Sequence, residues 1–367
     1  MTLKVAVVGT RGIPANYGGF ETFAEELSKR LVARGHRVTV YGRNHYIRKG
    51  LGSFEGVKIR RLPAIKHKYL DTVSNTFLSI SDAIFRSYDI LLICNAANAF
   101  LSWVPRLRGQ KVVLNVDGIE RRRKKWNWLG REFYRLSERM SVYCPNEIVT
   151  DAETIRDYYL ERYNRLSFFI PYGAKVGKAD TREILEELKL KEEAYLIFVS
   201  RLEPENNAHL VIKAYLQSGV DLPLVVVGNA PYSSDYIAGL QELARSGNVL
   251  MPGAIYGDAY WELLSHSLCY LHGTEVGGSH PALIEAMGAG TVVIAHDTRE
   301  NREVLGKGGI LCSFEASEVL ADLMKKVAEE RSNFEVYTSL AQKRVREKYN
   351  WEVVTDQYED LFYALTR

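Results

Sequence analysis

Residues 272–286 of this chain read HGTEVGGSHPALIEA and join a predicted strand to a predicted helix. The strand is the apolar run at residues 268–271, which is short enough to be buried in a sheet. The glycine pair Gly277-Gly278 lets the backbone approach a ligand closely, and Pro281 has the preset φ of a first helical position. The stretch therefore predicts a strand, a glycine loop and a helix in succession.

A helix that starts after such a loop offers unpaired amides and a partial positive charge to a phosphate or pyrophosphate. Glu285 lies one turn further into the predicted helix, where its carboxylate can accept hydrogen bonds from sugar hydroxyls. The alternative is an ordinary strand-to-helix connection with an exposed glutamate. Spacing alone leaves both interpretations open.

Length and composition indicate a globular protein of two domains. A chain of 367 residues exceeds the usual size of one domain, and 46% hydrophobic with 25% charged residues is an ordinary composition. The four cysteines lack metal-ligand spacing, so we expect reduced core residues in a cytoplasmic protein. We expect neither a signal peptide nor a membrane-spanning run of about 18 apolar residues.

The small net charge of +3 conceals an asymmetry between the two halves. Residues 1–173 hold 29 Lys and Arg against 16 Asp and Glu, a balance of +13, whereas residues 174–367 hold 19 against 29, a balance of −10. The basic half is expected to meet an anionic partner such as a membrane surface or a phosphorylated lipid. Nucleic acid is a weaker alternative because no binding motif accompanies the charge.

Apolar runs alternate with helix-like segments along both halves, which predicts two doubly wound α/β domains with parallel sheets. Strands are expected at residues 4–8, 37–41, 57–62, 90–94, 112–116, 146–150, 195–199, 224–227, 249–252, 268–271 and 291–295. The final helices are expected over residues 317–344 and 351–365. Two Rossmann-like halves facing across a cleft could hold a nucleotide-bearing ligand on one wall and a second substrate on the other.

The first strand leads into a glycine loop that fails the dinucleotide fingerprint. Residues 9–18 contain no G-x-G-x-x-G, and the next strand ends in Gly42-Arg43 without the acid that would hold a ribose. The pair Gly18-Gly19 at the following helix start could offer amides to a phosphate or simply turn the chain.

Two further candidates follow predicted strands, where ligands bind in open α/β sheets. Asp117 comes directly after the strand at residues 112–116, and Arg201 comes just after the strand at residues 195–199. The guanidinium of Arg201 could hold a diphosphate as a fork. The alternatives are a turn aspartate before a glycine and a surface arginine.

A cationic run that ends in tryptophan predicts contact with an anionic membrane surface, with the aromatic rings at headgroup level. The run consists of Arg121, Arg122, Arg123, Lys124, Lys125 and Trp126, and Trp128 follows it closely. The alternative is a solvated basic helix whose tryptophans pack on the core.

Several of these residues resemble the C-terminal domain of the retaining GT-B glycosyltransferases of family four. The matching set is Val199-Ser200-Arg201, Gly253, Gly277-Gly278, Pro281, residues 285–290 and Glu303-Val304. At the front, residues 9–23, GTRGIPANYGGFETF, and residues 115–118 resemble a bacterial branch that includes rhamnosyltransferases of capsule and cell-wall polysaccharide assembly. The resemblance spans nearly the whole chain.

The resemblance implies an acceptor-side domain at residues 1–173, a nucleotide-sugar donor domain at residues 174–349, and a C-terminal helix at about residues 350–367 that crosses back onto the first domain. It also implies a role for each matched position. Gly18 and Gly19 would approach the donor phosphates, Arg201 would neutralise the leaving diphosphate, amides around Gly278, Ser279 and His280 would support it, Glu285 would hold the ribose, and Asp117 would lie on the acceptor side. No metal is implied, because arginine and the helix dipole replace the cation.

Two positions depart from the family pattern. The family lysine five residues after the arginine is Asn206 here, and the family glutamate eight residues before Glu285 is Gly277. Glu275 lies two residues earlier. These changes fit a deoxysugar donor such as rhamnose, which lacks a 6-hydroxyl group.

The sequence thus leads us to expect a retaining, metal-independent glycosyltransferase at the inner face of the cell membrane. It would move rhamnose from dTDP-rhamnose to a lipid-linked or glycan acceptor. A GT-B-fold nucleotide-sugar epimerase and a non-catalytic nucleotide-sugar-binding subunit remain alternatives. The missing dinucleotide fingerprint argues against a nicotinamide-dependent dehydrogenase.

Overall fold

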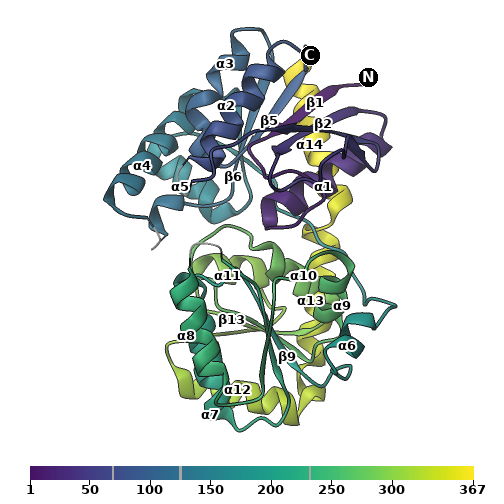
Figure 1. Ribbon diagram of the computed structural model, residues 1–367, viewed down its shortest axis with the longest axis vertical. Helices are drawn as coiled ribbons and strands as arrows, with labels where there is room; N and C mark the ends of the chain where they lie inside the picture. Colours follow the sequence, from purple (N-terminus) through teal and green to yellow (C-terminus); the bar gives the residue numbers. More distant parts are fainter. Residues whose placement is uncertain (68–69, 124–125, 231–232) are drawn as a thin grey trace. The chain divides into compact units, whose positions relative to one another are not determined.

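The computed structural model describes residues 1–67, 70–123, 126–230 and 233–367. The chain forms two compact units, the first from Met1–Tyr172 with Trp351–Arg367 and the second from Gly173–Asn350. Each unit is a parallel sheet with helices packed on it (Figure 1). The predicted α/β fold with two parallel sheets is therefore confirmed.

The sheet of the first unit has the order β3-β4-β2-β1-β5-β6-β7-β8, parallel except for the β3–β4 pair. The central strands are fully buried, which explains why they read as continuous apolar runs rather than as alternating ones. The strands are β1 (Lys4–Val8), β2 (Arg37–Arg43), β3 (Ser53–Phe54), β4 (Val57–Leu62), β5 (Ile90–Cys94), β6 (Lys111–Val116), β7 (Glu147–Thr150) and β8 (Phe168–Phe169).

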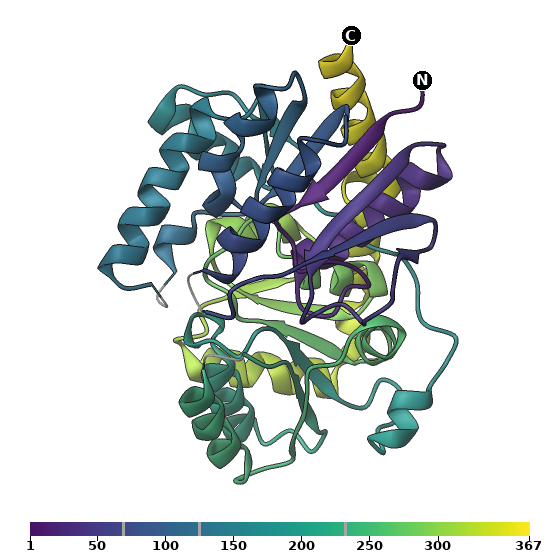
Figure 2. The ribbon, with the colours of Figure 1, turned by 45° about the horizontal axis from the view of Figure 1, so that its top comes forward.

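The helices of the first unit include the last helix of the chain. They are α1 (Gly19–Ala33), α2 (Asp71–Ala83), α3 (Trp103–Arg106), α4 (Trp128–Tyr143), α5 (Glu153–Tyr163) and α14 (Trp351–Thr366), with short 3-10 turns η1 (Ala96–Leu101) and η2 (Glu120–Arg122). Helix α14 packs on α1, where the rings of Phe23 and Tyr358 have centroids 5.4 Å apart (yellow and purple in Figure 2). The C-terminal segment thus completes the first unit.

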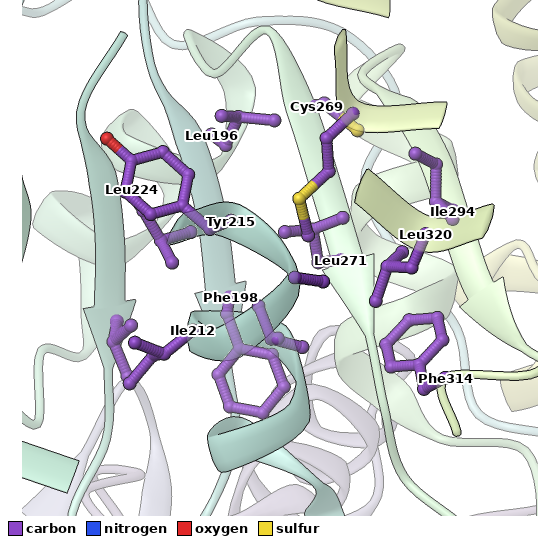
Figure 3. Close-up of a cluster of buried hydrophobic side chains, with 14 of the residues drawn as sticks. Leu196, Phe198, Ile212, Tyr215, Leu224, Cys269, Leu271, Ile294, Phe314 and Leu320 are labelled. Atoms are coloured by element: carbon purple, nitrogen blue, oxygen red, sulfur yellow. The ribbon is translucent and has the colours of Figure 1, made fainter. Parts of the chain in front are cut away.

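The sheet of the second unit has the order β11-β10-β9-β12-β13-β14, and its pairs are all parallel. Phe198, Leu271 and Ile294 from neighbouring strands meet in its buried core (Figure 3). The strands are β9 (Leu196–Val199), β10 (Leu224–Val227), β11 (Val249–Gly253), β12 (Cys269–His272), β13 (Val292–His296) and β14 (Ile310–Cys312).

The helices of the second unit follow the predicted alternation, with one correction near the end. A single helix is predicted over residues 317–344, but the polar residues 329–333 interrupt it with a 3-10 turn, because they offer no apolar side chain to the core. The helical segments are α6 (Glu183–Glu187), η3 (Pro204–Asn206), α7 (Ala208–Ser218), α8 (Ser234–Ala244), α9 (Gly257–Ser265), α10 (Pro281–Ala289), α11 (Arg299–Leu305), α12 (Ser317–Glu329), η4 (Arg331–Phe334) and α13 (Glu335–Lys348).

Strand order reverses beside the first strand of each sheet. β1 lies between β2 and β5, and β9 lies between β10 and β12. Ligands of open α/β sheets bind beyond the carboxyl ends of the strands at such switch points. In the second unit, the loops at this position are the one after β9, which contains Arg201, and the one after β12, which contains residues 273–280.

Candidate functional site

The loops after β9 and β12 are joined by hydrogen bonds at the switch point of the second unit. The amide of Glu275 donates to the carbonyl of Glu205 at 3.2 Å. The side-chain amide of Asn207 donates to the carbonyl of Gly273 at 2.9 Å and to Oε1 of Glu275 at 3.0 Å. The segments that carry Arg201 and the glycine pair are therefore held side by side within one unit.

Arg201 is half-buried at the carboxyl end of β9. Its carbonyl accepts hydrogen bonds from the amide of Glu203 at 2.7 Å and from Nδ2 of Asn206 at 2.6 Å. Its Nη1 lies 4.0 Å from Oε2 of Glu203. Asn206, which is buried, thus fixes the turn that carries the guanidinium, and at this position the family has a lysine.

The loop before α10 leaves little room for a side chain at residue 277. A Cβ built on Gly277 would lie 2.5 Å from Cε1 of His280. His280 itself has a φ of +47°, in the left-handed region, and Ser279 is buried. A side chain at residue 277 would therefore require the ring of His280 to move.

Glu285 is oriented by Tyr260 of α9. The Tyr260 hydroxyl donates to Oε2 of Glu285 at 2.6 Å. Burial and the charge of Glu285 raise the pKa of Tyr260 well above its usual value, so this hydroxyl keeps its proton. The hydrogen bond fixes one carboxylate oxygen, which pre-organises Glu285 on the first turns of α10. Sequence reasoning missed Tyr260 because the two residues lie on different helices.

His272 ends β12 directly before the glycine loop and is buried. Its Nδ1 lies 3.0 Å from the hydroxyl of Tyr270, and its ring lies 5.0 Å from that of His280. Burial, with the nearby His280 and His296, holds the pKa of His272 well below its usual value. The ring is therefore neutral near pH 7, and within the described part of the chain its Nε2 has no hydrogen-bond partner.

The glycine loop of the first unit is anchored by two carboxylates of α1. The amide of Arg11 donates to Oε1 of Glu21 at 2.8 Å, and the amide of Ala15 donates to Oε2 of Glu25 at 2.7 Å. Gly18 and Gly19 are half-buried at the start of α1. These bonds give the loop at the switch point of the first sheet a defined shape.

Arg11 is a candidate site residue that sequence reasoning did not single out. Its guanidinium carbon lies 3.0 Å from the ring centroid of Tyr17 and 4.5 Å from that of Tyr46. Cation–π contacts of this kind fix the plane of a guanidinium. The sequence of the loop gave no sign of the contact with Tyr46, which follows β2.

Asp117 is half-buried directly after β6 in the first unit. Burial raises the pKa of Tyr172 well above its usual value, and the charge of Asp117 is the second cause. The nearby Asn115 donates from Nδ2 to the hydroxyl of Tyr358 at 2.5 Å. Asp117 belongs to the first unit, whereas Arg201 and Glu285 belong to the second unit.

The predicted cationic run is only partly a surface feature. Arg123 is buried and donates to Glu120 at 2.6 Å, and Arg121 lies 3.0 Å from Oε1 of Glu138. Trp126 is buried against Tyr134, with ring centroids 5.1 Å apart. It precedes α4, which Asn127 caps and which begins at Trp128. Arg122 is exposed, and Lys124 and Lys125 lie outside the described residues.

Other features of the described residues lie apart from these loops. A pocket of about 400 Å³ in the first unit, which Asp89 and Gln110 help to line, lies at the amino ends of β5 and β6. Residues 1–67, 70–123, 126–230 and 233–367 contain no group of three His, Cys, Asp or Glu side chains arranged to hold a metal ion. In the same ranges, every helix is too short or too polar to cross a membrane.

Family models match both halves of the chain. Residues 17–171 match the model of Glycosyltransferase Family 4, and residues 180–346 match the model of Glycosyl transferases group 1. An uncharacterised glycosyltransferase of Methanocaldococcus jannaschii is 28% identical over 59% of this chain and 58% of its own length. The N-acetylgalactosamine-N,N'-diacetylbacillosaminyl-diphospho-undecaprenol 4-alpha-N-acetylgalactosaminyltransferase of Campylobacter jejuni is 23% identical over 45% of each chain.

Solved structures match over almost the full length of the chain. HepE of Anabaena, crystallised with UDP and glucose, has a TM-score of 0.81 at 15% identity, with 99% of this chain and 100% of that chain covered. Sucrose-phosphate synthase of Thermosynechococcus elongatus has a TM-score of 0.81 at 17% identity, with 99% of each chain covered. At these identities the likeness establishes the fold, which is GT-B.

Proposed function

We propose that this chain, a glycosyltransferase of the GT-B type by its fold and family matches, transfers a sugar from a nucleoside diphosphate to a lipid-linked or glycan acceptor. The observation that carries the proposal is the junction of two loops in the second unit. One loop presents Arg201, and the other leads through the glycine pair to the amino end of α10. Both lie at the carboxyl ends of adjacent strands, where a diphosphate is bound in such sheets.

Each side chain at this junction suits one part of the donor. Arg201 and the amides at the start of α10 offset the charge of the diphosphate as it leaves. Glu285, held by Tyr260, accepts hydrogen bonds from ribose hydroxyls. The bond from the anomeric carbon to the diphosphate oxygen breaks, the acceptor hydroxyl forms the new bond to that carbon, and its proton passes to the leaving phosphate.

The finer assignment is L-rhamnose from dTDP-rhamnose, in the assembly of a bacterial surface polysaccharide. It is supported by the resemblance of residues 9–23 to rhamnosyltransferases and by the small residue at position 277, where a family glutamate would touch the donor sugar. A lipid-linked acceptor is supported by the Campylobacter jejuni relative, whose name includes a diphospho-undecaprenol acceptor. We propose that transfer retains the anomeric configuration and needs no metal.

The proposal is tested by supplying the purified protein with dTDP-rhamnose, UDP-glucose or GDP-mannose and a polyprenyl-diphosphate-linked sugar. We expect a glycosylated lipid from one donor, turnover unchanged by EDTA, and a loss of about 100-fold in Arg201→Ala, in the range for the loss of one charge-stabilising donor. Arg245→Ala, at an exposed ion pair of the same unit, serves as the control. A new nucleotide sugar formed without acceptor would instead establish an epimerase.

A further inference from the structure

We propose that the exposed side of α4 docks on the surface of an anionic lipid bilayer. We call this side the α4 face and define it by four side chains. They are Trp128, Leu129, Phe133 and Leu136, which are 71%, 58%, 38% and 55% exposed. The proposal concerns where the protein binds and does not depend on the donor assigned above.

Helix α4 exposes apolar side chains that an ordinary surface helix would bury, and it buries several polar ones. Ser137, Glu138 and Ser141 are buried in the first unit, alongside a tyrosine and a valine of the same helix. Leu129, Phe133 and Leu136 are exposed and follow the spacing i, i+4, i+7, so they form one stripe. An exposed apolar stripe of this kind marks an interaction surface.

The positive charges on the same helix favour an anionic partner. Arg131, Arg135 and Arg139 are exposed on the same helix, and Arg122 is exposed just before it. The ion pair between Arg135 and Glu132 is itself exposed and weak. A helix with aromatic and leucine side chains on one side and arginines at its margins lies in the interface plane of a membrane, where the arginines reach the phosphates.

Other elements of the first unit also expose apolar side chains. Nη1 of Arg106 in α3 donates to the carbonyl of Cys144 at 2.8 Å, just after α4, and the rings of Phe100 and Phe133 meet edge to face. Trp103 of α3 and the following Leu107 are 49% and 73% exposed. The helices α2, α3 and α4 belong to the same unit (Figure 1), which holds 30 Lys and Arg against 20 Asp and Glu, a balance of +10.

The second unit has few such side chains. Within its described residues, the large apolar side chains that are exposed are Tyr256, Val319, Val336 and Leu340. Val336 and Leu340 share α13, the other two lie on different segments, and none of the four is a tryptophan or phenylalanine. The apolar surface and the positive charge thus coincide in one unit, as binding to an anionic bilayer requires.

The test is co-sedimentation of the full chain with vesicles of phosphatidylglycerol and phosphatidylcholine. We expect binding to these vesicles and little binding to phosphatidylcholine alone. The triple variant Leu129→Ser, Phe133→Ser, Leu136→Ser should bind at least about tenfold more weakly, because each lost apolar contact reduces partitioning. The variant Arg131→Gln, Arg135→Gln, Arg139→Gln should lose binding to the anionic vesicles in particular.

The matched control is Val336→Ser, Leu340→Ser, which removes exposed apolar side chains from α13 of the second unit and should leave binding unchanged. Because the substituted side chains are exposed, the far-ultraviolet circular dichroism of the variants should match that of the wild type. Equal binding by the wild type and the α4 triple variant would overturn the proposal. So would light scattering that shows a dimer which the triple variant abolishes, because a second copy would then cover the face.

Discussion

Glu285, which we propose holds the donor ribose, is oriented by a residue that is distant in the sequence. Its position one turn into α10 is readable from the sequence, but its orientation depends on Tyr260 of α9. A carboxylate with one oxygen already hydrogen-bonded loses less conformational entropy when it binds a diol. The hydroxyl of Tyr260 is therefore a positioning group rather than one that touches the reacting atoms.

Tyr260→Phe is expected to weaken donor binding by about tenfold or roughly 1.4 kcal/mol, near the lower end for one hydrogen bond to a charged group. Nucleotide-sugar titration measures this, and the pH dependence of turnover should keep its shape, because the hydroxyl does not ionise. The control is Tyr215→Phe, whose hydroxyl donates to the carbonyl of Leu222 at 2.8 Å and is distant in sequence from α9 and α10. Unchanged donor affinity in Tyr260→Phe would contradict this role.

Gly277 is a second test at the residue scale. In Gly277→Ala the new Cβ would meet the ring of His280, which must move and disturb the start of α10. We expect a loss of about 1–3 kcal/mol in the free energy of unfolding and weaker nucleotide binding. Gly239→Ala in α8, where nothing lies within 4 Å of the added Cβ, should stabilise the protein slightly. Equal stability of the two variants would show that the loop adapts.

At the scale of elements, α14 is bound to the first unit by charge as well as by apolar packing. Arg34 of α1 approaches Glu352 at 2.9 Å, Asp356 at 2.5 Å and Glu359 at 2.9 Å. The guanidinium of Arg34, hydrogen-bonded to Glu352, holds the pKa of that carboxyl below its usual value. Pairing of this carboxylate therefore stabilises the fold above the usual glutamate range and is lost as the pH falls through the lowered pKa.

Arg34→Ala is expected to reduce the free energy of unfolding by about 1 kcal/mol at pH 7 and by less at pH 3.5, because the pairs are partly exposed and need ionised carboxylates. Urea unfolding at both values measures the difference. Arg245→Ala, which breaks an exposed pair in α8 and the turn after it, should change little at either pH. A larger effect of Arg34→Ala at pH 3.5 than at pH 7 would refute the assignment.

Sequence patterns predicted the long strands well because buried parallel strands are continuous apolar runs. They missed β14 and β8, whose three and two residues are too short to show a pattern. Trp126 and Trp128 mark another limit. Asn127 caps α4, so Trp126 precedes the helix and is buried, whereas Trp128 begins the helix and is exposed. The spacing of the two tryptophans does not show where the helix starts.

The candidate site was partly readable in the same way. Arg201, the glycine pair and Glu285 stand out because they follow strands or start a helix, and the structure places all of them at one switch point of the second unit. Tyr260 and Arg11 did not stand out, because their respective partners Glu285 and Tyr46 come from other elements. The hydrogen bond from Asn206 to the Arg201 carbonyl could not be predicted from the sequence. There, Asn206 is notable only because it replaces the lysine of the family pattern.

At the scale of the whole molecule, two sheets of similar topology carry opposite charge. The first unit has the basic surface and the exposed α4 face, and the second has the loops suited to a diphosphate. This division matches a chemistry in which one substrate is a soluble nucleotide sugar and the other is held at a membrane. In this division of roles, we propose that Arg201 binds the nucleoside diphosphate.

Calorimetric titration of dTDP, UDP, GDP and NAD into the wild type and Arg201→Ala tests this claim directly. We expect dTDP to bind with an affinity about tenfold, or roughly 1.4 kcal/mol, higher than that of the other nucleotides. Arg201→Ala should bind the nucleoside diphosphate at least about tenfold more weakly than the wild type. A preference for UDP would support the donor-site assignment but contradict dTDP-rhamnose as the donor. Binding of NAD alone, of no nucleotide, or of the diphosphate with equal affinity in Arg201→Ala would contradict the account.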